Sequence, residues 1–168
     1  MPIPDFITEL RRHVGTAPLW LTGATAVVLR EVDGRPHVLL VRRADSGRWA
    51  PVSGIVDPGE HPHVTAERET LEEACVVAVA ERLAWVSVTE PVTYDNGDRA
   101  TYLDHTFACR WVSGEPAVGD DESLEARFFP ADDLPDLPDE FAARVRVALA
   151  GRAETGFGPL PGTPGRSA

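Results

Sequence analysis

The 168-residue chain contains no lysine, so all sixteen of its basic residues are arginines. This absence excludes a lysine nucleophile and Schiff-base chemistry, and any binding of phosphate must use guanidinium groups, backbone amides or a metal. Basic residues are also few beside the 27 acidic ones, which leaves a net charge of −11. That charge argues against a nucleic-acid polymer as a partner, because polymer binding requires a concentrated basic surface.

Long apolar runs and cysteines are scarce as well. The longest apolar run, residues 75–80, is far too short to span a membrane, and the first residues contain no apolar stretch typical of a signal peptide. We therefore expect a cytoplasmic protein with no membrane contact. Cys75 and Cys109 match no metal or redox spacing, so we interpret both as small buried side chains and expect no disulfide.

The length and the 43% hydrophobic content predict one domain with a single core. We expect an N-terminal helical segment over residues 1–17, the main domain over 18–152 and a disordered tail over 153–168. Glycine and proline are frequent in residues 45–60, which we interpret as a long loop. Apolar patterns predict strands at 23–32, 36–44, 76–90, 100–111 and from 123, and helices at 4–13, 62–74 and 139–151. This mixture predicts an α/β (α+β) sandwich with a mixed β-sheet.

Three glutamates crowd one face of the helix predicted at residues 62–74. At 100° per residue, Glu72 lies about 60° to one side of Glu69 and Glu73 about 40° to the other. The residues on the opposite side, which we expect to pack on the sheet, are Val64, Leu71, Ala74 and Cys75. A charged helix face is usually only solvated, but like charges four residues apart cost about 0.2–0.5 kcal/mol. Three carboxylates also form the kind of surface that Mg²⁺ or Mn²⁺ prefers, so a cation site is the alternative.

The residues before this helix continue the pattern at fixed distances. A glycine is followed after five residues by a glutamate, after seven more by Arg-Glu and after two more by Glu-Glu. This spacing resembles the Nudix box, the signature of the Nudix hydrolase family, which runs Gly-x5-Glu-x7-Arg-Glu-U-x-Glu-Glu-x-Gly-U with U aliphatic. The positions that agree are Gly54, Glu60, Arg68, Glu69, Glu72, Glu73 and Val76.

Three positions depart from the pattern. Thr70 stands where an aliphatic residue is usual, and Cys75 stands where a glycine is usual. Ser53, just before the box, replaces a glycine that many relatives have there. None of these changes removes a carboxylate, so they affect the expected backbone of the loop and the helix end more than the expected chemistry.

The resemblance implies a Nudix-type α/β/α sandwich and a MutT-like or ADP-ribose-pyrophosphatase-like enzyme. Its substrate would be a small molecule in which a nucleoside diphosphate is linked to another moiety, such as ADP-ribose, a nucleotide sugar or a nucleoside triphosphate. Water would attack a phosphorus with Mg²⁺ as the cofactor and Mn²⁺ as a substitute. A homodimer is a further expectation from the family.

The same resemblance assigns the metal ligands. Glu69, Glu72 and Glu73 would bind the metal, the carbonyl of Gly54 could be a further ligand, and Glu122 matches the place where several relatives have an additional metal-binding glutamate.

Catalytic roles follow from the same positions. Glu60 and Arg68 would form an ion pair that orients Glu69, and either Glu69 or Glu73 could be the general base. The side chains near the loop that we expect to contact the substrate are Arg42, Arg43, Arg48 and Trp20.

Two other functions on the same fold remain open. A catalytically weak nucleotide-binding or regulatory protein would not need all five charged box residues. An isomerase of isoprenoid diphosphates would need a cysteine ahead of the box, and neither Cys75 nor Cys109 lies there.

Overall fold

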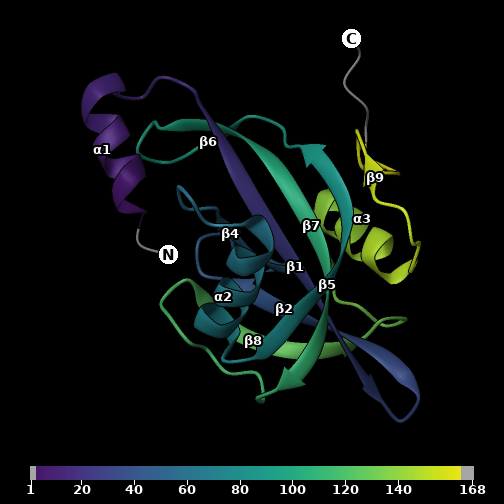
Figure 1. Cartoon of the computed structure of the whole chain (residues 1–168). Helices are drawn as coiled ribbons and strands as arrows, with labels where there is room; N and C mark the ends of the chain where they lie inside the picture. The colour runs from purple at the N-terminus through teal and green to yellow at the C-terminus, as the bar shows by residue number, and fades with distance from the viewer. Residues whose placement is uncertain (1–2, 164–168) are drawn as a thin grey trace.

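Three helices and nine strands make up the structure, a computed structural model that describes residues 3–163. The helices are α1 (Asp5–Val14), α2 (Pro62–Ala74) and α3 (Asp139–Leu149). The strands are β1 (Leu19–Val32), β2 (Arg35–Arg43), β3 (Trp49–Ala50), β4 (Val52–Ile55), β5 (Val77–Val88), β6 (Val92–Thr93), β7 (Arg99–Ser113), β8 (Ser123–Pro130) and β9 (Gly156–Phe157). They form one mixed sheet of order β3-β2-β1-β7-β5-β9, in which β4 pairs with β1, β6 with β7 and β8 with β2 (Figure 1).

Side chains of the central strands alternate between two apolar layers. Ala26 of β1 packs with Ala66 of α2 on one face of the sheet. Val27, the next residue, packs with Val145 of α3 on the other face. Because both faces are buried, β1 and β2 have nearly continuous apolar runs instead of a polar and apolar alternation. The predicted α+β sandwich with a mixed sheet is confirmed.

A buried polar cluster attaches α3 to the sheet. Arg144 is only 2% exposed and forms an ion pair with Asp104 of β7. Its guanidinium also donates to the hydroxyl of Thr25 at 2.7 Å and to the carboxylate of Glu140 at 2.5 Å. Thr25 and Thr106 donate in turn to the two oxygens of Asp104, at 2.8 and 2.9 Å. A buried charge is strongly destabilising when its partner is missing, so this cluster fixes where α3 lies on the sheet.

The prediction of one long loop over residues 45–60 is wrong at its centre, where β3 and β4 lie. Gly54 of β4 pairs with Ala24 of β1 in an antiparallel ladder. Proline and glycine hid this strand from the sequence pattern. A glycine in a strand often marks a close approach of another group, and Gly54 is such a case.

The prediction of a disordered tail from residue 153 also differs from the structure. Residues 156–157 form β9, which pairs in parallel with Trp85 and Val86 of β5. The Trp85 indole N–H donates to the carbonyl of Gly158 at 2.9 Å. A Cβ at Gly156 would overlap the Trp85 ring, so this approach requires glycine. The last five residues of the chain lie outside the described part.

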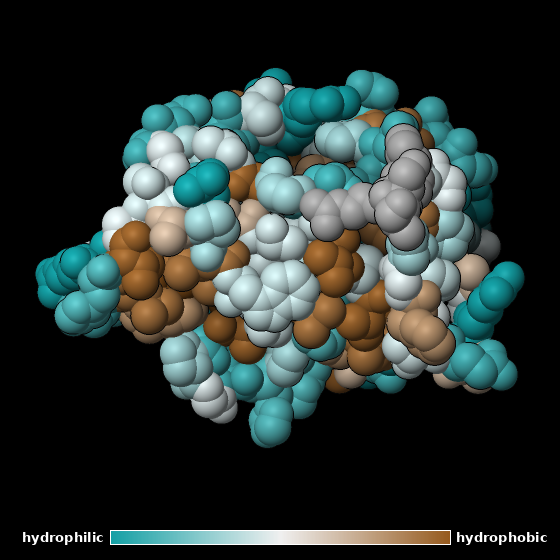
Figure 2. Space-filling view, turned by 90° about the horizontal axis from the view of Figure 1, so that it is seen from above, coloured by the Kyte–Doolittle hydropathy of each residue, from teal (hydrophilic) through white to brown (hydrophobic). Residues whose placement is uncertain are grey.

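The N-terminal helix lies at the end of the sheet near β6 (Figure 1). Ile7 of α1 is buried, whereas Leu10 and Val14 are exposed. Figure 2 looks onto this end and shows apolar side chains in separate patches between polar groups. The homodimer stays a prediction. Within residues 3–163, no helix is long and apolar enough to cross a membrane.

Helix α2 ends at Cys75, which adopts a left-handed conformation with φ 56° and ψ 25°. Its backbone N–H donates to the carbonyl of Leu71 at 3.1 Å, as a helix-ending glycine does. The thiol of Cys75 is exposed, so the interpretation of a buried side chain holds for Cys109 but is wrong for Cys75. The backbone therefore keeps the glycine-type turn of the Nudix box despite the Cβ.

Replacing Cys75 by glycine should stabilise the protein, because a residue with a Cβ is strained at positive φ. We expect Cys75→Gly to raise the free energy of unfolding by roughly 0.5–1 kcal/mol in urea titrations. Cys75→Ala is the matched control, since it removes the thiol but keeps the Cβ, and it should remain close to the wild type. An equal gain in both variants would show that the thiol, not the backbone, is responsible.

Candidate active site

Helix α2 turns two of its glutamates, Glu69 and Glu73, toward the protein interior, whereas Glu72 is exposed. Glu69 is 1% exposed and Glu73 5% exposed, whereas Leu71 is 52% exposed. The prediction that Val64 and Leu71 form the packing face is therefore wrong. The buried residues of the helix are Thr65, Ala66, Glu69, Thr70, Glu73 and Ala74. Thr70 fits this face because its hydroxyl donates to the carbonyl of Ala66 at 2.7 Å, which satisfies the buried group.

The Glu69 carboxylate lies directly against the backbone of Gly54. A Cβ at Gly54 would overlap the carboxylate, so any other residue at this position would displace Glu69. Arg68 donates to Glu69 at 2.8 Å. Burial raises the pKa of Glu69 to about 7, and the positive charge of Arg68 opposes that rise. Glu69 is thus a carboxyl group that changes charge near neutral pH.

Glu73 lies one turn further along the same buried face. Burial raises its pKa to about 8, and repulsion from Glu69 and Asp120 adds to the rise. The guanidinium of Arg43 acts in the opposite direction. The hydroxyl of Ser123 donates to Glu73 over a long 3.5 Å. Two neighbouring buried carboxyl groups therefore lack enough positive charge around them to remain ionised at neutral pH.

Arg68 connects the loop before α2 to the helix. It donates to both carboxylate oxygens of Glu60, each at 3.0 Å, and to Glu72 at 3.1 Å. The hydroxyl of Thr65 completes the site by donating to Glu60 at 2.7 Å. The hydrogen bonds from Arg68 hold the pKa of Glu60 near 2, with burial opposing them. The predicted pair of Glu60 and Arg68 is therefore present and adjoins Glu69.

The carboxylates of this site suit a hard divalent cation, which prefers oxygen ligands and would relieve the repulsion between Glu69 and Glu73. Across residues 3–163, however, no three carboxylate, imidazole or thiolate groups converge closely enough to hold an ion as the side chains lie. Arg68 holds Glu69 and Glu72 toward itself. The donor types fit a metal, and binding would require some of these side chains to turn.

Glu122 lies in the segment between β7 and β8 and directly precedes Ser123. Its carbonyl accepts from the backbone N–H of Ala44 at 2.7 Å, and the next residue, Ser123, contacts Glu73. Asp120 in this segment also raises the pKa of Glu73. Asp120 and Ser123 could not be identified from the sequence, because their approach to Glu73 depends on how the segment crosses the end of α2.

The positive charge of Arg43 acts on Glu73 and opposes the rise in its pKa. Arg43 also donates to both carboxylate oxygens of Asp45, at 3.0 and 2.6 Å. These bonds lower the pKa of Asp45 to about 2. Of the three predicted arginines, Arg43 is therefore the one whose charge affects the pKa of Glu73.

The other predicted substrate-contacting residues lie elsewhere around the loop. Arg42 is 3.8 Å from the carboxylate of Glu125 on β8, and Arg48 is 3.7 Å from Asp136, in the segment leading to α3. Trp20, at the start of β1, is 62% exposed. The structure does not gather these side chains into one cluster with the glutamates.

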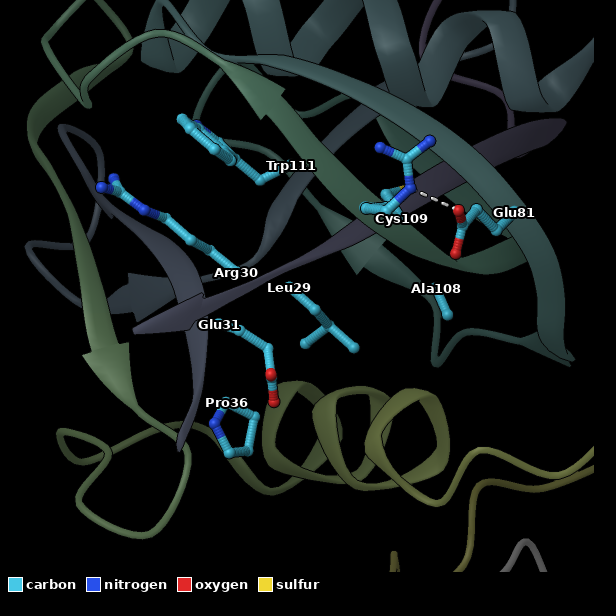
Figure 3. Close-up of a pocket in the computed structure, with 9 residues that line it drawn as sticks. Leu29, Arg30, Glu31, Pro36, Glu81, Ala108, Cys109 and Trp111 are labelled. Carbon is cyan, nitrogen blue, oxygen red and sulfur yellow. Dashed lines mark hydrogen bonds and ion pairs between the residues drawn. The ribbon is translucent and has the colours of Figure 1, made fainter. Parts of the chain in front are cut away.

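A separate hollow of about 480 Å³ lies further along β1 and β7, near residues 29–31. Figure 3 shows Arg30 alongside Trp111, with the guanidinium 4.5 Å from the ring centroid. The dashed line in the same view joins Glu81 to Arg110, whose separation is 2.6 Å. None of the box residues lines this hollow, so it is not part of the candidate active site.

Comparison with known proteins supports the resemblance of this chain to the Nudix hydrolases. The chain is 31% identical over 133 residues to the "Nucleoside triphosphate pyrophosphatase/Nudix hydrolase fusion protein" of Bifidobacterium longum, a match that covers 74% of this chain and 26% of that protein. It is 28% identical over 134 residues to the "MutT-like protein" of Streptomyces ambofaciens, covering 80% of each. The chain thus spans about a quarter of the fusion protein and most of the MutT-like protein.

The fold agrees as well. An ADP-ribose pyrophosphatase from Streptococcus suis superposes with a TM-score of 0.58 at 22% identity, covering 82% of this chain and 98% of that one. The model of the NUDIX domain matches residues 20–150, which include the glutamate helix, the loop before it and α3. The chain therefore belongs to the Nudix family.

Proposed function

We propose that this chain is a Nudix-type pyrophosphohydrolase, which cleaves the diphosphate bond of a small molecule containing a nucleoside diphosphate linked to another moiety. The observation that carries the proposal is the pair of buried carboxyl groups of Glu69 and Glu73, whose pKa values burial raises to about 7 and 8. A merely solvated helix face would leave both groups in water. Perturbed carboxyl groups that lie together are typical of catalytic sites.

The reaction follows from the position of these carboxyl groups. The oxygen of a water molecule forms a bond to phosphorus, and the bridging oxygen of the diphosphate leaves with the electron pair of the broken bond. The water proton passes to a carboxylate, and either Glu73 or Glu69 could accept it, since a pKa near the working pH suits a general base. Arg68 orients the Glu69 carboxylate, with the bidentate pair to Glu60 as its anchor.

Nudix hydrolases generally use divalent metal ions. When bound, Mg²⁺ or Mn²⁺ would neutralise the diphosphate charge and lower the pKa of the attacking water. We propose Glu69, Glu72 and Glu73 as the residues that hold it, with the Gly54 carbonyl and Glu122 as further ligands. The strongly acidic chain needs such a cation, because a diphosphate would otherwise be repelled from this face.

The identity of the substrate rests on the names of similar proteins. One relative is named for nucleoside triphosphates and one structure for ADP-ribose. Both compounds contain a nucleoside joined through a diphosphate, and we propose substrates of that class. Location in the cytoplasm and a homodimer stay predictions.

The alternative is a catalytically weak nucleotide-binding or regulatory protein on the same fold. The observation that favours this alternative is that Arg68 already donates hydrogen bonds to Glu69 and Glu72, which leaves fewer carboxylate oxygens for a metal. Against it, all of the charged box residues are retained. Nucleotide titration by calorimetry would show tight binding without turnover if this alternative is correct.

The proposed reaction is tested by a panel of nucleoside diphosphate derivatives with Mg²⁺ and Mn²⁺, with both products identified. Glu73→Gln should lower kcat by roughly 10²–10⁴-fold, because the neutral amide can neither accept the water proton nor give the metal a carboxylate ligand. Glu67→Gln is the matched control from the same helix, since the amide oxygen can still accept from the backbone N–H of Ala80. The proposal fails if no diphosphate compound is cleaved, or if Glu73→Gln is as active as the wild type.

The metal-free protein should lose stability as the pH rises from about 5 to 8. The carboxyl groups of Glu69 and Glu73 ionise near pH 4.5 in the unfolded chain but near 7 and 8 in the folded one. Over that interval the unfolded state releases its protons first, so unfolding becomes easier. Mg²⁺ or Mn²⁺ should therefore raise Tm by several degrees more at pH 8 than at pH 5, because ionised carboxylates bind the cation.

Calorimetric scans of the wild type and of Glu73→Gln would measure this effect. The variant should have a flatter dependence of Tm on pH without metal and a smaller response to Mn²⁺. A metal response of equal size at both pH values would contradict the assignment of these carboxylates as ligands.

Gly54→Ala should disrupt the site without removing a charged group, because the new Cβ would overlap the Glu69 carboxylate. We expect kcat to fall at least about tenfold and the affinity for Mn²⁺ to decrease, measured by turnover and by electron paramagnetic resonance. Gly23→Ala is the control on the adjacent strand, where a Cβ would make ordinary contacts of 3.5–3.7 Å. Wild-type behaviour of Gly54→Ala would exclude a role for this contact.

A further inference from the structure

A cavity of about 340 Å³ lies between the first turn of α1, the loop after β4 and the exposed edge of α2. One part of its lining is apolar and includes Phe6, Ile55 and Pro58. The other part is charged and consists of one arginine and three acidic residues, Arg68, Asp5, Asp57 and Glu72. The cavity therefore joins the candidate active site to a segment of the chain that precedes it by about fifty residues.

That segment lies outside the family match, which begins at residue 20. It is nevertheless firmly attached. Ile7 is 5% exposed and packs with Leu21 and Ala100. Arg11, at the other end of α1, is 3.3 Å from the carboxylate of Asp98 and donates to the carbonyl of Arg99 at 2.8 Å. The first turn of α1 is thus a fixed wall of the cavity.

The charged part of the cavity belongs to the catalytic machinery. Arg68 donates to Glu72 at 3.1 Å, and Glu72 is one of the three glutamates of the box. A diphosphate bound at this helix would have its charged end here. The attached group would then extend along the cavity toward α1.

The apolar part has the chemistry to bind a nucleoside. Phe6 is partly buried, and it lines the cavity together with Ile55, the residue directly after Gly54. Both side chains pack against the apolar cluster that contains Ile7. An aromatic ring next to a phosphate-binding edge can stack on a nucleobase, and such stacking contributes about 1–3 kcal/mol per base. Asp5, the neighbouring acidic residue, can accept hydrogen bonds from ribose hydroxyls or from an amino group of the base.

We propose, building on the proposed function, that this cavity binds the nucleoside part of a nucleoside diphosphate, with the base stacked on Phe6. Helix α1 then determines which diphosphate compounds the enzyme accepts, although it lies outside the family domain. In this arrangement Phe6 determines specificity by stacking on the base, and Asp5 contributes by accepting hydrogen bonds from the nucleoside. The phosphates remain at α2.

The test is equilibrium binding of ADP in the presence of Mg²⁺, measured by calorimetry on the full chain. Phe6→Leu keeps an apolar side chain against the cluster around Ile7 but removes the aromatic face, and Phe6→Ala removes both. We expect each to weaken ADP binding by about 5- to 100-fold, and Phe6→Tyr to bind as the wild type does. Inorganic pyrophosphate, which has no base, should bind equally to the wild type and to Phe6→Leu.

Leu10→Ala is the matched control, since Leu10 is on the same helix, is 41% exposed and does not line the cavity. It should leave ADP binding unchanged, and thermal melts would verify that every variant is folded. The inference is overturned if the wild type does not bind ADP, if Phe6→Leu binds ADP as the wild type does, or if it loses ADP and pyrophosphate equally.

These outcomes separate the two proposals. Phe6-dependent binding of ADP by a protein that cleaves no diphosphate would reject the hydrolase but retain the cavity assignment. Cleavage of diphosphates together with ADP binding that does not depend on Phe6 would retain the hydrolase and reject the cavity assignment.

Discussion

The contact between the backbone of Gly54 and the carboxylate of Glu69 is the constraint on which the site depends. It places a carboxyl side chain of α2 under a strand, where it is almost fully buried. A carboxylate in that position needs compensation, and Arg68 supplies it from the preceding residue while Glu60 holds Arg68. The Glu69 carboxylate therefore links helix α2 to strand β4 directly and to the preceding loop through Arg68 and Glu60.

This constraint also explains why the helix packs as it does. An amphipathic helix normally buries leucine and valine, yet α2 exposes Leu71 and buries Glu69 and Glu73. On this face, only the alanines Ala66 and Ala74 contribute apolar packing. The buried carboxylate of Glu69 is stabilised instead by the hydrogen bond from Arg68. A protein that keeps such a costly arrangement has a chemical use for it, in agreement with the functional proposal.

The residue pattern was enough to predict the helix at residues 62–74, and the resemblance to the box was enough to predict the pair of Glu60 and Arg68. The residue pattern was not enough to predict which side of the helix faces inward, because periodicity shows that two faces differ but not which one contacts the sheet. Strand β4 was missed because glycine has a low strand propensity, and position 54 requires glycine to leave room for the Glu69 carboxylate. Asp120 and Ser123 were missed because only the tertiary path of the β7–β8 segment brings them to Glu73.

The opposite face of the sheet is organised differently, with Arg144 buried in an ion pair with Asp104, whereas the active-site face buries Glu73 beside a second acid, Glu69. Beyond that face, β9 closes part of the free edge of β5 through two residue pairs and the bond from Trp85 to Gly158. An uncovered strand edge can recruit a strand from another molecule. A shortened chain that stops before Gly156 would therefore present that edge to its neighbours, and its first defect would be self-association in concentrated solution rather than a loss of chemistry.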